Sequence, residues 1–551
     1  MAVVTATIKS GEEVMNASFE LLSIDVSKEF NKIPTAELKL IDGDIAKKEF
    51  KILDGDFFEP GKKVEIALKY ERKLEIEKTI FEGVVINQSL ELNRLGPTLT
   101  IELSDKAINM TGIRKNSVHL NKSDSDIMTT LIEQNGLTVD TISATKGKHD
   151  QMVQYYASDW DFMVSRAEAN GRLVSVNDGK VSVIQPQIQN TSKEIELGKD
   201  EIYDFDLQIN GRNQYQEVSS IAWDFSEQKL TAPVEGNEYE IKQGKQNISQ
   251  LATAIGTKKH TLMQAVPMHR DELQSWSDAQ IIKSRLSLVK GWIKIPGTTI
   301  FEVGKTITIK GVGKHFTGKN IISGIRHEVT TEGWVTHLQI GMNAQWFTAQ
   351  PNVVDTQAAG LLPGINGLQI GIVQSDEKDT NDPFQVRVMI PAFGTDQGAI
   401  WARFTSIDAG AGRGVFFRPE KGDEVIVGFL NDDPRQAIIL GSVHNPKKKI
   451  PMPNNKQNTQ KGIFFTTSKS QLLFDQETEV ITLSTSEQNC ICIDEKQKCI
   501  SLSDANGNEI ELSKKGIVIT STGDCEIKSE GNLNLDAKGN VKIKGKKIDL
   551  I

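Results

Sequence analysis

The chain has 551 residues, with 64 Lys and Arg, 73 Asp and Glu, and a formal net charge of −9. This length allows three or four domains, and the acidic balance argues against a general nucleic-acid-binding protein, which usually carries a basic face. No apolar run approaches the roughly 18 residues of a transmembrane helix, and no basic segment followed by an apolar one opens the chain. We therefore expect a protein made in the cytoplasm, without a signal peptide or a transmembrane helix.

The first 350 residues are expected to form two β-rich modules around a mixed region. Short strand patterns separated by turns over residues 1–118 favour a first barrel. Residues 119–200 mix strands and helices, because Ser123–Asn135 begins with a capping residue and has apolar residues at helical spacing. Residues 201–350 return to strands as a second barrel, around a helix expected from Asp271 to Lys290.

A compact third module is expected between two connectors. Residues 351–367 carry Pro and Gly without periodicity and are interpreted as a linker, as are residues 447–461. Between them, residues 368–446 contain short strands, including the period-2 pattern in which Phe384, Val386, Val388 and Ile390 alternate with Gln385, Arg387 and Met389. Five or six short strands in this length predict a small closed barrel of the OB type.

The last 90 residues carry a repeat of apolar pairs, in which the two members are two residues apart. The pairs are Ile481/Leu483, Ile491/Ile493, Ile500/Leu502, Ile510/Leu512, Ile517/Ile519, Cys525/Ile527, Leu533/Leu535, Val541/Ile543 and Ile548/Leu550. From Ile517 onward the step is eight residues three times and then seven, and the expected turn glycines Gly523, Gly531 and Gly539 keep the same interval. Each octad thus predicts one short strand and one turn.

Two apolar side chains per step cannot enclose a core within one chain. Three chains wound around a common axis would bury them, since each chain then supplies one wall of every layer. We therefore expect residues 462–551 to form a trimeric, triple-stranded β-helix, with an ordinary antiparallel meander as the alternative. The expected core residues at the trimer interface are Ile510, Leu512, Ile517, Ile519, Ile527, Leu533, Leu535, Val541, Ile543, Ile548 and Leu550.

Four segments, namely Gly410–Asn445, Tyr155–Gly171, Phe81–Val85 and the C-terminal octads, together resemble one family. This family is the VgrG (valine–glycine repeat protein G) spike of type VI secretion systems. Gly410–Asn445 is similar to its OB-module signature, with Gly-Arg-Gly, Pro-Glu-x-Gly-Asp-Glu-Val and Asp-Pro-Arg in order. Tyr155–Gly171 is similar to a motif of its head, and Phe81–Val85 to a strand of its first barrel. The C-terminal octads resemble its needle, although Leu and Ile stand at most inner positions in place of valine.

The resemblance implies a mainly β fold: a phage-hub-like head of two barrels with a small α/β insertion, an OB-fold collar, and a trimeric β-helix needle. It implies a homotrimeric spike seated on the inner tube and baseplate of a contractile machine. Such a spike carries a PAAR-repeat tip protein and effectors, and it is injected through the target envelope on contraction. A spike of a phage-tail-like particle or of a contractile phage is the alternative within the same class.

The sequence contains no Gly-x-Ser-x-Gly elbow, His-Glu-x-x-His motif or Walker A loop, so we expect no enzyme, catalytic residue, cofactor or metal. Gly410–Gly414 has the composition of a phosphate-binding loop but no helix pattern follows it. Cys490, Cys492 and Cys499 are interpreted as apolar fillers of strands. Acidic residues beside the aromatic residues of the OB module argue against nucleic acid as a partner. The rival interpretations are an effector-bearing enzyme with its site in residues 120–260, and a trimeric adhesin, which would need an export signal.

The final residues, 537–551, are basic. They hold five lysines and one aspartate, a net charge of +4. A solvated outer face is the simplest interpretation of these charges. The alternative is that Lys546 and Lys547, together with the apolar end Leu550 and Ile551, dock the tip protein.

Overall fold

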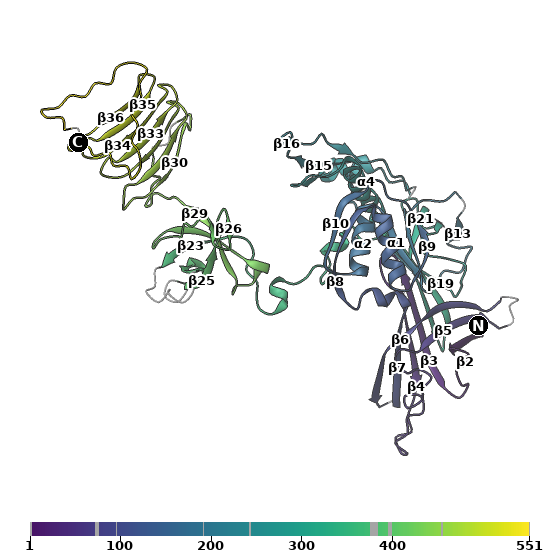
Figure 1. The fold of residues 1–551 in the computed structure, drawn as a ribbon. Helices are drawn as coiled ribbons and strands as arrows, with labels where there is room; N and C mark the ends of the chain where they lie inside the picture. Colours follow the sequence, from purple (N-terminus) through teal and green to yellow (C-terminus); the bar gives the residue numbers. More distant parts are fainter. Residues whose placement is uncertain are drawn as a thin grey trace. The chain divides into compact units, whose positions relative to one another are not determined.

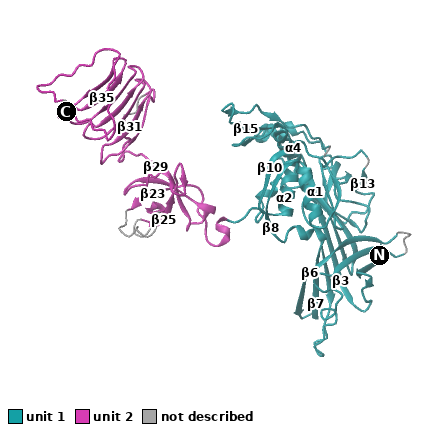
Figure 2. Cartoon of the chain, viewed as in Figure 1, with its two compact units in different colours: residues 1–356 teal, residues 357–551 magenta. Residues whose placement is uncertain are grey.

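In the computed structural model of the protein, the described residues are 3–71, 76–94, 96–190, 192–241, 244–374, 384–394, 399–452 and 456–549. They belong to two compact units, Met1–Thr356 and Gln357–Ile551 (Figure 2). Both units are built mainly from β-strands, as expected from the sequence (Figure 1). None of the helices in the described part of the chain is long and apolar enough to cross a membrane.

The first unit is organised around a sheet of 13 described strands. Its N-terminal half contains β1 (Val4–Ser10), β2 (Glu13–Val14), β3 (Glu20–Glu29), β4 (Thr35–Ile41), β5 (Lys63–Tyr70), β6 (Lys78–Asn93) and β7 (Gly96–Ser104). The other half contains β13 (Lys193–Glu196), β14 (Asp204–Ile209), β19 (Val289–Pro296), β20 (Thr306–Lys310), β21 (Gly318–Thr330) and β22 (Gly333–Ile340). Antiparallel pairing of β3 with β21, in which Val26 lies opposite His327, joins the two halves into one sheet.

Each half of this sheet buries its own apolar face. In β7 every second residue is buried, and Leu99, Ile101 and Leu103 are fully enclosed together with Phe58 and Phe81. In the other half the alternating residues of β20 and β22 form a second apolar cluster with β19 and β21. The period of two that predicts these strands therefore also explains which side chains form the two cores.

The helix α1 (Asp124–Gln134) follows the sequence signals closely, and α2 (Asp159–Ala169) packs against it. Ser123 caps α1: its Oγ accepts the Asp126 N–H, and the Asp126 carboxylate accepts the Ser123 N–H. The helices pack near β8 (Arg114–Lys122), β9 (Thr138–Ile142), β10 (His149–Ser158), β11 (Leu173–Asn177) and β12 (Lys180–Ile184). The expected helix over Ser123–Asn135 is confirmed, with Ser123 and Asn135 as its two capping residues.

The expected helix from Asp271 to Lys290 is too long by several residues. Helix α4 spans Arg270–Leu286, and Val289 already begins β19, where it pairs with Ile209 of β14. Leu286 and Val289 fit helical spacing and both are buried. They nevertheless belong to different elements, because Leu286 is the last residue of α4 and Val289 is the first residue of β19. The sequence pattern also missed α3 (Ile248–Ile255), which Asn247 caps. Three strands precede α3 in the chain: β15 (Glu217–Asp224), β16 (Lys229–Leu230) and β17 (Val234–Glu235). One strand, β18 (Lys259–Gln264), lies between α3 and α4 in the chain.

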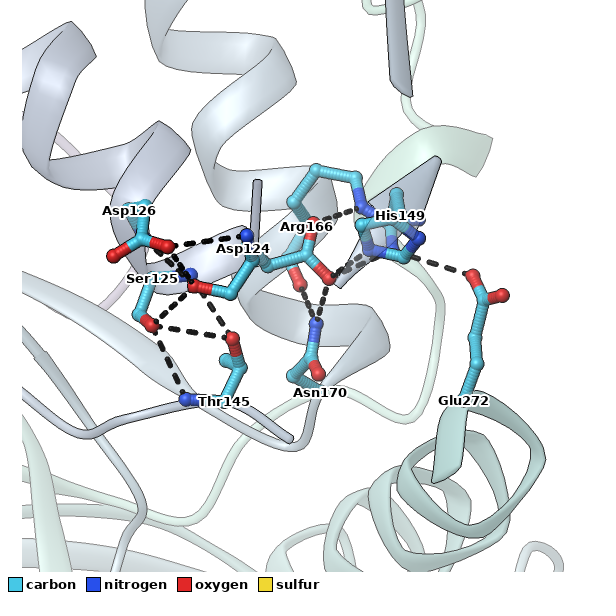
Figure 3. Close-up of polar contacts among 9 residues, drawn as sticks. Asp124, Ser125, Asp126, Thr145, His149, Arg166, Asn170 and Glu272 are labelled. Carbon is cyan, nitrogen blue, oxygen red and sulfur yellow. Dashed lines mark hydrogen bonds and ion pairs between the residues drawn. The ribbon is translucent and has the colours of Figure 1, made fainter. Parts of the chain in front are cut away.

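A buried polar cluster connects α1, α2, β10 and α4 (Figure 3). The Arg166 guanidinium donates to both oxygens of Asp124, at 2.7 and 2.9 Å, and reaches Glu272 at 3.4 Å. Asp124 also lies 3.0 Å from His149 Nε2 and accepts a hydrogen bond from the Asn170 amide at 2.8 Å. Burial alone would raise the pKa of Asp124, but the hydrogen bonds and the charge of Arg166 outweigh it and lower that pKa to about 2. The cluster is therefore charged and satisfied within the chain.

The second unit begins with the predicted OB-type barrel. Its five strands close in the order β23 (Gln369–Gln374), β24 (Gln385–Met389), β25 (Ala399–Phe404), β29 (Ala437–Val443) and β28 (Glu424–Phe429). Val386 and Val388 of β24 are buried with Val425 and Val427 of β28. A short hairpin, β26 (Ala409–Gly410) and β27 (Arg413–Gly414), lies between β25 and β28 in the chain. The glycine-rich segment over 410–414 is thus a hairpin turn.

Candidate functional site

The rest of the second unit is a single antiparallel sheet made from consecutive hairpins (Figure 1). Its strands are β30 (Gln460–Phe464), β31 (Gln471–Asp475), β32 (Val480–Ser484), β33 (Cys490–Asp494), β34 (Cys499–Ser503), β35 (Glu509–Ser513) and β36 (Gly516–Thr520). Each is five residues long, so each presents two side chains on one face and three on the other. We call residues 460–520 the C-terminal sheet.

The apolar pairs of the sequence form two continuous ladders across one face of this sheet. Five residues from successive strands, Leu483, Ile491, Leu502, Ile510 and Ile519, lie opposite one another as neighbours. The second ladder runs beside the first through Ile481, Ile493, Ile500, Leu512 and Ile517. Such cross-strand contacts of branched side chains stabilise a sheet along its own surface.

The ladders begin earlier than the sequence pattern indicated. Ile463 of β30 lies opposite Leu472 of β31, which lies opposite Leu483. Phe474 of β31 lies opposite Ile481 in the same way. The alternation in QLLFD over Gln471–Asp475 was the signal that could have identified them, but Leu472–Phe474 contains three apolar residues in a row and hides it.

Nothing in the described part of the chain covers these ladders. In β32 to β35 the eight ladder side chains keep between 37% and 50% of their surface exposed, whereas Leu99, Ile101 and Leu103 of the first unit are 0% exposed. A shallow hollow of about 540 Å³ lies over one end of the face, with Leu483, Ile491, Leu502 and Ile510 in its lining. Contiguous apolar surface of this kind is uncommon on monomeric proteins and marks an interaction surface.

The opposite face of the same sheet carries mostly small and polar side chains, with Leu473, Val480 and Val518 among the larger apolar ones. Ser501 and Ser503 of β34 lie on it, as do Cys490 and Cys492 of β33 and Cys499. Among the described residues no group of three or more His, Cys, Asp or Glu side chains is arranged to hold a metal ion. The two faces therefore differ in chemistry, and the apolar one is the candidate functional surface.

The distal octads, residues 521–549, differ from the expectation of one short strand in each. The described residues of this segment contain no strand, and the chain bends at 522–523, 530–531 and 538–539. Gly523, Gly531 and Gly539 thus lie at bends, but none of the three has a left-handed φ, and open space surrounds each. A strand needs a partner for its backbone N–H and C=O groups, and this segment pairs with no strand in the part of its own chain that the structure describes.

The expected core residues are consequently divided between two environments. Ile510, Leu512, Ile517 and Ile519 belong to the ladders of the C-terminal sheet. The remaining described ones lie in the distal octads, where each is at least half exposed: Ile527, Leu533, Leu535, Val541, Ile543 and Ile548. Leu550 and Ile551 lie outside the described residues. Lys546 and Lys547 are both exposed, and Lys547 forms an ion pair with Asp549 at 2.8 Å.

Comparison with known proteins gives two family matches. The model for the Alg8 N-terminal domain matches residues 1–331, and the model for the type VI secretion system/phage-baseplate injector OB domain matches residues 369–444. The second match covers the closed barrel of the second unit.

Two of the curated relatives are named as type VI secretion system spike proteins, and a third is named as the actin cross-linking toxin VgrG1 of Vibrio cholerae, 31% identical over 106 residues that cover 18% of this chain and 10% of the relative. The type VI secretion system spike protein VgrG3 of Vibrio cholerae is 25% identical over 178 residues, which cover 25% of this chain and 17% of the relative. The spike protein VgrG1b of Pseudomonas aeruginosa is 32% identical over 115 residues, covering 20% of this chain and 16% of the relative. The matched regions thus span less than a fifth of each relative. They confirm the resemblance to VgrG spikes that the sequence motifs indicated.

A solved structure covers a larger share of the chain. The E. coli c3393 protein, described as a component of the type VI secretion system with structural similarity to the bacteriophage T4 tail proteins gp27 and gp5, aligns with 79% of this chain and 99% of its own. The sequence identity is 11% and the TM-score is 0.39.

Proposed function

The chain belongs to the Alg8 N-terminal domain family, and from this premise we propose that it is the central spike of a contractile injection machine of the type VI or phage-tail kind. The match of residues 369–444 to an injector OB domain and the VgrG relatives support this assignment. The spike acts as a homotrimer that is driven through the target envelope. It works mechanically and needs no catalytic step.

The observation that carries the proposal is the uncovered pair of apolar ladders on the C-terminal sheet. Because each ladder is one side chain wide, the face is a narrow strip that runs across all the strands. Three such strips meeting around an axis bury one another along their full length, and the polar faces with Ser501 and Ser503 turn to water. Burial of one Ile or Leu side chain contributes roughly 1.5–3 kcal/mol, so the repetition along the axis makes the assembly stiff.

In the proposed trimer, the distal octads continue the needle by a different pairing. The backbone of 521–549 has no ladder partner among the described residues of its own chain, so its strands would form between chains. The inward side chains are then Ile527, Leu533, Leu535, Val541, Ile543 and Ile548, with the bends at Gly523, Gly531 and Gly539 as corners. Residues 462–551 would thus be a triple-stranded β-helix whose first part consists of three preformed walls.

The other modules serve as the base of the spike in this proposal. The two halves of the 13-stranded sheet close into two barrels when three heads form a ring, with the region 119–200 between them, and the ring sits on the inner tube and the baseplate. The OB barrel within 368–446 forms the collar, and residues 351–367 and 447–461 are connectors. Before contraction the spike resides in the cytoplasm, and contraction then delivers it into the target cell with its effectors.

The tip carries a separate PAAR-repeat protein in this proposal. Lys546, Lys547, Leu550 and Ile551 are the docking residues, because three copies of an apolar end surrounded by lysines would otherwise face water. Removal of residues 549–551 should abolish binding of the tip protein while the needle remains trimeric. Unchanged binding by this variant would remove the docking assignment and leave the spike assignment intact.

Light scattering on the purified full chain tests the proposal directly. A spike should have a molar mass near three times 61.0 kDa. A monomer with native β-sheet content would overturn the proposal, because the ladders would then remain exposed in the functional state.

A further inference from the structure

The first unit contains a cavity of about 720 Å³ between the end of α4 and the start of α3. Arg285 of α4 and Leu288 line it from one side, and Asn247, Ile248 and Ser249 at the start of α3 from another. Gln216, Gln246, Glu238 and Glu240 complete the polar part of the wall. The cavity lies in the head and has no part in the proposed needle.

Arg285 is the unusual member of this cavity. Its side chain is only 8% exposed, yet its one hydrogen bond in the described part of the chain goes to the Ser284 hydroxyl, at 3.0 Å. No described carboxylate lies within ion-pair distance of it, whereas Arg166, whose side chain is 18% exposed, holds Asp124 with two hydrogen bonds. A guanidinium has five N–H donors, and a buried arginine is expected to use them on an anion.

The surroundings of Arg285 limit which anion fits. The N-terminal turn of α3 carries a partial positive charge toward the cavity, which favours a negative ligand. Glu238 and Glu240 add two negative charges to the wall, so a dianion such as phosphate would meet more repulsion than a group with one charge. The side-chain amide oxygen of Gln216 accepts a hydrogen bond from the Ser249 hydroxyl at 3.2 Å. Together with the glutamate carboxylates, it offers acceptors for N–H groups of a ligand.

We propose that this cavity binds a carboxylate of a polypeptide, with Arg285 as the residue that holds the carboxylate through paired N–H donors. A planar carboxylate matches the guanidinium fork, and the surrounding acceptors match the amide N–H groups that accompany a carboxylate in a peptide. The carboxylate comes from a chain end or from an Asp or Glu side chain, and both sources have the same chemistry at Arg285.

Isothermal titration calorimetry on the full-length protein tests the proposal with small probes. N-acetyl-triglycine represents a chain end, N-acetylglutamate α-amide represents a side-chain carboxylate, and N-acetyl-triglycine amide lacks the charge. At least one of the two acids should bind one per chain and at least about tenfold more tightly than the amide. The better acid identifies the source. Equal binding of acid and amide, no binding of either acid, or tighter binding of inorganic phosphate would overturn the proposal.

Variants separate binding at Arg285 from a purely structural role of this arginine. Arg285→Gln should weaken binding of the better acid at least about tenfold. Ser249→Asp introduces a carboxylate at an exposed position of the wall, where it should pair with Arg285 and block binding. Ser249→Asn introduces a neutral side chain of the same size as Asp, and this variant should bind the acid as the wild type does. Glu238→Gln removes a repulsive charge and should strengthen binding about twofold or more. Wild-type affinity in Ser249→Asp, or weaker affinity in Glu238→Gln, would contradict the assignment.

Discussion

We call the first unit, residues 1–356, the head, and its sheet of 13 described strands the head sheet. The head sheet and the C-terminal sheet are built from the same alternation of apolar and polar residues, but only the head sheet buries its apolar side within the chain. In β7, Leu99 and Ile101 are fully enclosed by Phe58, Phe81 and neighbouring strands. In β33 and β34, Ile491 and Leu502 keep 42% and 49% of their surface exposed. The alternation thus tells which side chains share a face, and the packing of a second layer decides whether that face is a core or an interface.

The polar groups of the two regions differ in the same way. The head contains the charged cluster of Asp124, Arg166 and His149, whose hydrogen bonds are satisfied inside the unit. Residues 521–549 form no strand with any described residue of the chain. We therefore expect the head to fold alone, and the C-terminal region to complete its structure in the proposed trimer.

The largest effect is expected from a charge on the apolar face of the C-terminal sheet. Leu502→Asp would bring three carboxylates together near the axis of the trimer. Burying an unpaired charge costs about 4 kcal/mol or more per chain. The trimer should therefore be lost, with the molar mass falling from three chains to one in light scattering, while the head stays folded.

Ser501→Asp is the matched control, because residue 501 is the sequence neighbour of Leu502 on the opposite face. This variant should remain trimeric. If both variants assembled equally well, or if only Ser501→Asp dissociated, the assignment of the apolar face to the trimer axis would be wrong.

The next largest effect concerns the buried cluster of the head. Asp124→Asn leaves the Arg166 guanidinium buried without its counter-charge, and loss of one partner of a buried pair costs about 3–5 kcal/mol. Glu272→Gln removes only the outer partner of Arg166, at 3.4 Å and 28% exposed, and should cost less than about 1 kcal/mol. Chemical denaturation followed by tryptophan fluorescence should separate the two variants, and the trimer mass should not change in either. Equal costs would show that the cluster is not a buried ion pair in solution.

Local sequence signals were sufficient for the elements whose residues determine them locally. Ser123 and Asp126 fix the start of α1 by reciprocal hydrogen bonds, and the alternation over 384–390 predicted β24. The predicted end of α4 was wrong because the spacing of Leu286 and Val289 suits one continuous helix. The same spacing also suits a helix that ends at Leu286 and is followed by a strand that begins at Val289.

Features that depend on long-range contacts could not be predicted from the sequence. The Asp124 cluster gathers residues up to 148 positions apart in the chain, from Asp124 to Glu272, and no spacing rule connects them. The lack of a described carboxylate within ion-pair distance of Arg285 depends equally on the fold, since Glu238 acts on it only from further away. In the C-terminal sheet the pairs predicted the ladder residues, but the register that aligns Ile491 with Leu502 follows from the hairpin turns and became visible only in the structure.

Acid should weaken the head more than the needle. His327, at the junction of β21 with β3, has its pKa lowered to about 4, chiefly by burial and further by Lys28 and His337. The folded head thus keeps His327 neutral while the unfolded chain takes up a proton below pH 6.5. The stability from this group is complete above that pH and falls by about 3 kcal/mol as the pH drops from 6.5 to 4.

The pH dependence can be assigned with a variant that does not titrate. In His327→Asn the amide oxygen can still accept the hydrogen bond that Trp334 Nε1 donates to His327 Nδ1 at 3.4 Å. The head of this variant should show a flatter dependence of unfolding free energy on pH between 4 and 6.5. Residues 460–551 contain no histidine, so the trimer mass should remain constant over this range. An unchanged slope in the variant would assign the acid sensitivity to another group.

The smallest perturbation, alkylation of native thiols, can distinguish the inner from the outer side of the needle without breaking it. Cys490, Cys492 and Cys499 lie on the polar face of the C-terminal sheet, opposite the ladders, whereas Cys525 is an apolar-pair residue of a distal octad and is exposed in the single chain. In the trimer the first three should therefore react with iodoacetamide, and Cys525 should be protected. In Leu502→Asp, where the chains separate, Cys525 should become reactive as well. Mass spectrometry of peptides from briefly labelled protein measures all four sites at once. A thiol reacts only where the reagent can reach it. Fast labelling of Cys525 in an intact trimer, together with protection of Cys492, would therefore mean that the polar face points to the axis.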